Sequence, residues 1–206
     1  TTTMPRSETP FGRVSLPEDG LPDDNTWPFV LGEGETIRVG LINGSPADVA
    51  TLDEVFFLQA ALDSVGPGAP LRTTPLDAAT LTPSQLAHLD VVILANVGAM
   101  ERPAYAALHD FVSGGGGLLI TAGDRLTVPA ARHLEALMPI PLRGHKEVAD
   151  PQRPEAALSA LRISDFDLEH PVTALFGAVD DVSLLKAKTY RVALLEPAAR
   201  RARVIA

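Results

Sequence analysis

The chain has 206 residues, of which 46% are hydrophobic and 21% charged, a composition typical of a globular protein with a substantial core. Its formal net charge of −9 argues against nucleic acid or an anionic membrane surface as a partner, because both attract clustered lysine and arginine. The sequence contains no cysteine, which excludes disulfides, thiolate metal sites and cysteine nucleophiles, and no apolar run reaches the roughly 18 residues of a membrane-spanning helix.

Residues 1–34 are predicted to form a tail and a β-hairpin. Residues 11–16 alternate apolar and polar side chains like a half-buried strand, and residues 26–31 have the character of a second strand. The turn formers between them favour a hairpin. A hairpin alone is marginally stable in water, so we expect it to pack on the domain's own surface or to close a preceding β-domain. Residues 35–206 are assigned to one α/β domain.

The α/β domain is predicted to begin with a strand at residues 36–42. In the loop that follows, Ser45 is placed to cap a helix with Pro46 at its first position. We expect this helix to run from Ala47 to about Val65. The residues expected on its buried face are Leu52, Val55, Phe56 and Leu62. A short strand at residues 71–76 comes next.

Residues 82–85, TPSQ, form a capping box that predicts a short helix ending before Asp90. The apolar run at residues 91–97 is typical of a strand buried on both faces. Residues 101–113 have the three-four spacing of a helix with one buried stripe. The glycines at 114–117 are expected to end that helix.

Residues 117–123, GLLITAG, predict a second buried strand. A strand, a crossover helix and a second buried strand imply a right-handed βαβ unit, and hence a mostly parallel sheet flanked by helices. Beyond it we expect a helix at residues 128–137, a polar loop at 143–154 and strand character at 182–195. The chain starts without methionine and stops at residues 203–206 in what reads as mid-strand, so we expect a fragment truncated at its C-terminus.

The candidate ligand site lies where the parallel strands end, because open parallel sheets bind ligands beyond the carboxyl ends of their strands. The residues expected to meet there are Asn43, Gly44, Ser45, Asn96, Thr121 and Asp124. An alternative interpretation is that Ser45 and Asp124 cap helices while Asn96 satisfies loop backbone groups. No cofactor or metal site is predicted, since the acidic run at residues 165–170 matches no calcium loop.

Three segments, residues 90–97, 111–120 and 123–124, resemble the class I glutamine amidotransferase-like fold. More narrowly, they resemble the amidotransferase-like domain of bacterial membrane proteins with an N-terminal double-transmembrane region and a von Willebrand factor A domain, the aerotolerance-type set. Residues 14–25 are similar to the end of the β-sandwich before that domain. The resemblance covers roughly residues 11–206 and implies a flavodoxin-like domain on the extracytoplasmic, periplasmic side of a membrane-anchored protein.

In active members of that class a cysteine follows the strand equivalent to residues 118–120, and the resemblance puts Thr121 there, at the crest of a central strand. The class also uses a His-x-Glu dyad. His170 is followed by Pro171 and Val172, so this chain keeps a histidine and lacks the glutamate. Both departures imply that glutaminase chemistry is absent, since a threonine hydroxyl would need its own base.

The leading hypothesis is therefore a non-catalytic, amidotransferase-like interaction or ligand-sensing domain, a pseudoenzyme whose partner is another protein or another domain of the same chain. One alternative is a hydrolase or sugar-processing enzyme using Asp124 and His170, with a metal if needed, which requires these two side chains within hydrogen-bonding or single-metal reach. Another is a small-molecule binding module using Asn43, Ser45, Asn96 and Asp124. The sequence does not determine an oligomeric state.

Overall fold

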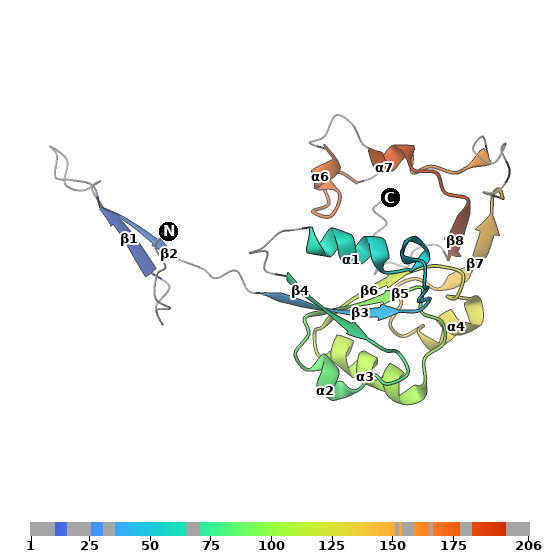
Figure 1. The fold of residues 1–206 in the computed structure, drawn as a ribbon, viewed down its shortest axis with the longest axis horizontal. Coiled ribbons are helices and arrows are strands. Elements are labelled where there is room, and N and C mark those ends of the chain that lie inside the picture. Colours follow the sequence, from blue (N-terminus) through green and yellow to red (C-terminus); the bar gives the residue numbers. More distant parts are fainter. Residues whose placement is uncertain are drawn as a thin grey trace.

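A computed structural model of the chain describes residues 11–15, 26–30, 36–64, 71–150, 153, 159–164, 167–177 and 183–196 (Figure 1). The strands are β1 (Phe11–Ser15), β2 (Thr26–Val30), β3 (Ile37–Asn43), β4 (Leu71–Leu76), β5 (Val91–Ala95), β6 (Gly117–Thr121), β7 (Leu142–Glu147) and β8 (Arg191–Leu195). The helices are the 3-10 turn η2 (Ala50–Leu52), α1 (Phe56–Asp63), α2 (Pro83–Leu86), α3 (Arg102–Ser113), α4 (Val128–His133), α6 (Ala174–Gly177) and α7 (Ser183–Lys186).

The centre of the fold is a four-stranded sheet with the order β4-β3-β5-β6. All three neighbouring pairs in it are parallel, as the strand-helix-strand pattern predicted. From β3 the chain first forms β4, which lies at one edge of the sheet. It then returns to the opposite side of β3 to form β5 and β6. The direction of winding therefore reverses between β3 and β5, which is the place where open α/β sheets bind ligands.

Alternating side chains of β3 and β5 supply a core on each face of the sheet. Ile42, Val92 and Leu94 face the larger core, which α2, α3 and α4 cover. On the opposite face, Val39, Leu41 and Ile93 form a small cluster against α1 (Figure 1). Helices thus cover both faces of the sheet, which is why its inner strands are almost continuously apolar.

Helix α3 and the glycines after it confirm the predictions for this stretch. Ala104, Ala107 and Leu108 are the buried stripe of the helix. Gly115 takes a φ of +100°, the left-handed region that glycine enters without strain. A Cβ at Gly116 would lie 2.3 Å from the ring of Phe111, so a larger residue there would displace the ring from the core. The capping box of α2 is also present, with Gln85 Oε1 accepting from Thr82 N–H at 2.8 Å.

The long helix predicted for residues 47–65 is wrong in its first half. Helix α1 begins only at Phe56, and Leu52, expected in the core, is 72% exposed. Phe56 is also exposed, whereas Leu62 packs on the small cluster as expected. The cause is Asp53, whose carboxylate accepts hydrogen bonds from Asn43 and from backbone N–H groups and holds residues 44–55 in a loop.

Strand β6 was expected to be central and buried on both faces, and both expectations are wrong for the described sheet. It pairs only with β5 there and is therefore an edge strand. Leu118 and Ile120 pack on the larger core, but Leu119 is 48% exposed on the other face. The reason is that the small cluster under α1 comprises residues of β3, β4 and β5 and does not extend to β6.

Two antiparallel pairs of strands accompany the sheet. β1 pairs with β2, as predicted, and Figure 1 shows this hairpin apart from the four-stranded sheet. β7 pairs with β8, so the polar segment at residues 143–154, expected to be a loop, begins within a strand. Residues 182–195 contain a helix, α7, as well as the strand β8. Within the described residues, every helix is too short or too polar to traverse a lipid bilayer.

Candidate functional site

The candidate site is a cavity of about 560 Å³ at the carboxyl ends of β3, β4 and β5. Its position coincides with the reversal of winding between β3 and β5. Asn43 ends β3, Asp77 follows β4, and the segment from Val97 leads from β5 into α3. The described residues lining it are Asn43, Gly44, Pro46, Asp77, Ala78, Ala79, Val97, Gly98, Ala99, Met100, Glu101 and Arg125.

The first wall of the cavity is the loop after β3, which Asn43 and Asp53 hold closed. Asn43 Nδ2 donates to both carboxylate oxygens of Asp53 at 2.9 Å, and Asn43 Oδ1 accepts from the N–H of Ser45 at 3.0 Å. Asp53 also accepts from the N–H groups of Ala47 and Val55. Ser45 therefore belongs to a side-chain turn and caps no helix, contrary to prediction.

Asn96, which follows β5, is the central hydrogen-bonding residue beneath the cavity. It is 1% exposed and has a φ of +51°, a left-handed conformation that asparagine tolerates better than most residues. Its Nδ2 donates to Glu54 Oε1 at 2.6 Å and to Asp124 Oδ1 at 2.7 Å. Its Oδ1 accepts from the N–H of Arg125 at 2.8 Å. One buried amide thus joins the loops that follow β3, β5 and β6.

Backbone contacts bring the same loops very close together. Gly44 N–H donates to the carbonyl of Ala95 at 2.8 Å, and Arg125 Nη1 donates to the carbonyl of Gly44. A Cβ at Gly44 would lie 2.1 Å from the carbonyl oxygen of Asn96, and one at Gly123 would lie 2.3 Å from the Asn96 side chain. Both positions therefore require glycine for steric reasons.

The electrostatics of this edge are dominated by ionised carboxylates. The hydrogen bond from Asn96 is the main reason that the pKa of Asp124 lies below its ordinary value of 3.8. Backbone N–H groups of Val55 and Ala47 lower the pKa of Asp53 in the same way. Both groups are therefore anions at neutral pH. The cavity itself offers two carboxylates, Asp77 and Glu101, and one guanidinium, Arg125.

These lowered pKa values predict acid sensitivity of the loop after β3. A carboxylate with a depressed folded-state pKa stabilises the fold above its unfolded value, and this stabilisation is lost as the pH falls through the folded value. We expect the melting temperature of the wild type to decrease once the pH is below about 4. Asp53→Asn should lower the melting temperature at pH 7 and make it less dependent on acid pH. Thermal unfolding at pH 7 and at acid pH measures both. Asp63→Asn, at the exposed end of α1, is the control. Equal acid dependence of Asp53→Asn and the wild type would contradict this account.

Thr121 lies next to this network without lining the cavity. Its carbonyl accepts the N–H of Asn96 at 3.2 Å, and it pairs in register with Ala95. Within the described part of the chain, its hydroxyl makes no hydrogen bond to a histidine or a carboxylate. Asp124 does not cap a helix either, because α4 begins at Val128 and its cap is Thr127, whose hydroxyl accepts from Ala130 N–H.

His170 is the candidate that the structure does not bring into this network. Its ring Nδ1 accepts from the N–H of Val172 at 3.3 Å, and its backbone bonds lie between residues 167 and 174. None of the described hydrogen bonds links His170 to Asp124, whose partner is Asn96. Across the described ranges of the chain, no three histidine, aspartate or glutamate side chains gather so as to hold a metal ion.

Sequence reasoning missed several residues of the site. Asp53 and Glu54 fell inside the helix predicted for residues 47–65. They could have been identified only if the true start of that helix, at Phe56, had been known. Asp77 could have been found, because it follows β4 just as Asn43 ends β3. Arg125 adjoins a predicted candidate, and its role follows from the distance between its guanidinium and Gly44, which no sequence pattern reports.

Comparison with known proteins adds no closer assignment. No protein-family model matches the chain, and no curated protein matches it at a significant level. The fold itself establishes only the general architecture. The chain contains an α/β domain whose four-stranded parallel sheet is flanked by helices, and two small antiparallel strand pairs accompany the sheet.

Proposed function

We propose that this chain is a non-catalytic, amidotransferase-like domain of a membrane-anchored bacterial protein, held on the extracytoplasmic side and used for ligand sensing and protein interaction. The observation that carries the proposal is the cavity at the reversal of winding, whose walls are fixed by Asn96 and Asp53. The strand order supports a flavodoxin-like fold, because such sheets share this arrangement of their first four strands. The membrane-anchored setting rests on the sequence resemblance, and the full-length gene product tests it through its flanking segments.

The cavity suits a small polar ligand. Its volume of about 560 Å³ falls in the range of small-molecule sites, roughly 300–1,000 Å³. Asp77, Glu101 and the Asn43 side chain offer hydrogen-bond acceptors, and Arg125 offers donors. Such a mixture suits a compound rich in hydroxyl groups, which can both donate and accept. The walls are preformed by hydrogen bonds between the loops, so binding would need little reorganisation.

The non-catalytic assignment is supported by the position that the resemblance gives to the nucleophile. Thr121 ends an edge strand, and among the described residues its hydroxyl forms no hydrogen bond to a histidine or a carboxylate. A threonine hydroxyl that is not hydrogen-bonded to a base is a weak nucleophile. Asp124 is bound to Asn96 and has a lowered pKa, so it is a poor proton donor at neutral pH.

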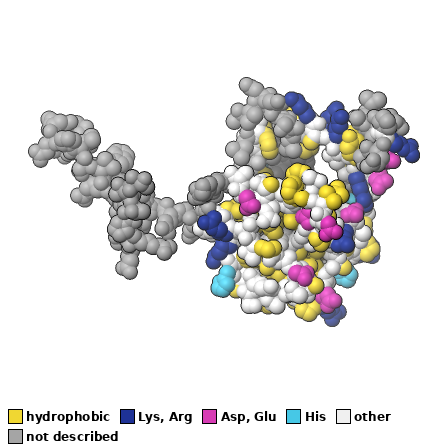
Figure 2. All heavy atoms as spheres, in the orientation of Figure 1, with side chains coloured by type: hydrophobic (Ala, Val, Ile, Leu, Met, Phe, Trp, Pro, Cys, Tyr) yellow, Lys and Arg dark blue, Asp and Glu magenta, His cyan; other side chains and the backbone are white. Residues whose placement is uncertain are grey.

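An interaction role is supported by exposed apolar side chains on and before α1. Phe57 is 66% exposed and packs edge-to-face on Phe56, with ring centroids 5.0 Å apart. Val49 and Leu52 are exposed on the preceding loop. Figure 2 shows hydrophobic side chains gathered over this part of the molecule. Contiguous exposed apolar surface of this kind is typical of a protein-binding face.

Thermal unfolding with a panel of monosaccharides and nucleosides tests the ligand site. A compound present at 100 times its Kd is expected to stabilise the domain by about 2.7 kcal/mol, or several degrees in Tm. Ala99→Trp, which fills the cavity, should abolish the shift, and Ala106→Trp, on the exposed face of α3 outside it, should preserve it. A shift unchanged by Ala99→Trp would contradict this site, and ammonia release from glutamine would contradict the non-catalytic assignment.

A further inference from the structure

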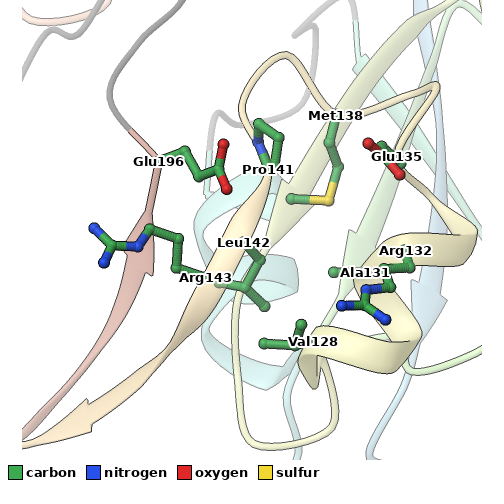
Figure 3. Close-up of a pocket in the computed structure, with 9 residues that line it drawn as sticks. All are labelled: Val128, Ala131, Arg132, Glu135, Met138, Pro141, Leu142, Arg143 and Glu196. Carbon is green, nitrogen blue, oxygen red and sulfur yellow. The ribbon is translucent and has the colours of Figure 1, made fainter.

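A second cavity, of about 360 Å³, lies between α4 and β7 and shares no described residue with the cavity at the carboxyl ends of β3, β4 and β5 (Figure 3). Its described lining residues are Val128, Ala131, Arg132, Glu135, Met138, Pro141, Leu142, Arg143 and Glu196. The backbone N–H of Glu196 donates to the carbonyl of Pro141 at 3.0 Å and joins the two sides of its rim. The site is therefore built from three separate segments of the chain.

The floor of this cavity is apolar and backed by further space. Ala131 and Leu142 are buried, and Val128 and Met138 pack against the larger core. A neighbouring cavity of about 340 Å³, lined almost wholly by apolar residues, shares Met138 and Leu142 with it. Because methionine is flexible, Met138 can shift toward that space. A bulky apolar group on a ligand would therefore find room above the floor.

The rim carries charges of both signs that are unpaired within the described residues. Figure 3 shows the carboxylates of Glu135 and Glu196 on opposite sides of the cavity, with Met138 between them. The guanidinium of Arg132 lies on the α4 side, whereas that of Arg143 extends away from the cavity. None of these four side chains forms an ion pair with another described residue. Among the described residues, two carboxylates and one guanidinium without an ion-pair partner thus lie above an apolar floor.

We propose that this cavity binds an α-amino acid with a bulky apolar side chain. The ammonium group would lie against Glu135 or Glu196, the carboxylate would accept from Arg132, and the side chain would rest on Val128 and Met138. Charge-assisted hydrogen bonds of this kind are the stronger ones in proteins. A simple amine or a simple carboxylate satisfies only one sign of charge, and glycine leaves the floor uncovered.

Titration calorimetry of the whole chain with L-leucine tests this proposal. L-Leucine is expected to bind about tenfold or more tightly than L-leucinamide, 4-methylpentanoate or glycine, since each of these lacks one of the three contacts. Arg132→Gln should remove the preference for leucine over leucinamide. The double variant Glu135→Gln with Glu196→Gln should remove the preference for leucine over 4-methylpentanoate. Arg102→Gln is the matched control, because this arginine is exposed at the start of α3 and does not line the cavity, and it should leave the affinity unchanged.

The outcomes also separate this site from the one at the carboxyl ends of the strands. Ala99→Trp fills only that other cavity and is expected to leave leucine binding intact. All the substituted side chains are exposed, so circular dichroism should show an unchanged fold. The proposal is overturned by an absence of leucine binding at millimolar concentration, by equal binding of leucine and leucinamide, or by equal effects of Arg132→Gln and Arg102→Gln.

Discussion

Asn96→Asp is expected to destabilise the fold by about 3 kcal/mol or more at neutral pH, although it changes a single atom of the side chain. The amide Nδ2 that donates to Glu54 and Asp124 becomes a carboxylate oxygen facing two other carboxylates. Asn96 is almost fully buried, so water cannot screen this repulsion well. Aspartate tolerates the positive φ nearly as well as asparagine, so the effect isolates the charge. Urea unfolding measures the loss.

The pH dependence distinguishes repulsion from simple loss of hydrogen bonds. Burial and two neighbouring carboxylates should raise the pKa of the new carboxyl, so its penalty is present above that pKa and lost as the pH falls through it. The difference in unfolding free energy between Asn96→Asp and the wild type should therefore decrease as the pH falls from about 8 to about 5. Asn96→Gly keeps the backbone conformation and adds no charge, so its difference in unfolding free energy from the wild type should stay constant over that pH range. A difference that is independent of pH for both variants would show that charge repulsion does not cause the destabilisation by Asn96→Asp.

The sheet could be predicted from sequence because its signals are local and agree with one another. The apolar run at residues 91–97 and the helical spacing at 101–113 describe β5 and α3, and the glycine run separates α3 from β6. A buried strand, a crossover helix and a second strand leave few arrangements other than a parallel pair. The burial of β6 could not be predicted, since exposure of Leu119 depends on how far α1 reaches across the sheet.

The wrong helix after β3 shows where local signals fail. Ser45 and Pro46 are favourable residues for a helix start, and nothing nearby opposes them. The structure instead forms the pair Asn43 and Asp53, ten residues apart, because one carboxylate there satisfies several donors at once. A contact over ten residues is invisible to a helical pattern. The resulting loop leaves Leu52 and Phe56 exposed and contributes Asn43, Gly44 and Pro46 to the cavity wall.

The site was predictable in its location and not in its contacts. The rule that ligands bind at the carboxyl ends of parallel strands selected Asn43, Asn96 and Asp124, and Asn96 bonds to Asp124. The rule could not identify Glu54 as the other acceptor of Asn96, because Glu54 was expected within a helix. His170 was chosen from the acidic run at residues 165–170 and from the resemblance, and its described side-chain bond is a local one to Val172.

Gly44→Ala is expected to lower the free energy of unfolding by about 4 kcal/mol or more, which corresponds to about 8–16 °C in Tm for a chain of this size. The added Cβ would lie 2.1 Å from the carbonyl oxygen and 2.4 Å from the carbonyl carbon of Asn96. These are backbone atoms, and Asn96 is held by three side-chain hydrogen bonds, so neither strand end can move away cheaply. The same clash would separate the loops that form the cavity, so ligand binding should weaken together with stability.

Two other glycines provide a graded control for this steric argument. A Cβ at Gly98 would lie 3.3 Å from the carbonyl of Arg125, a tight contact that a small shift relieves, so Gly98→Ala should cost about 1 kcal/mol. A Cβ at Gly144 would meet no atom within 4 Å, so Gly144→Ala should stay within about 0.5 kcal/mol of wild type. Thermal unfolding of the three variants should therefore rank them by contact distance. A Gly44→Ala protein as stable as Gly144→Ala would show that the ends of β3 and β5 separate easily, and the cavity between them would then not be preformed.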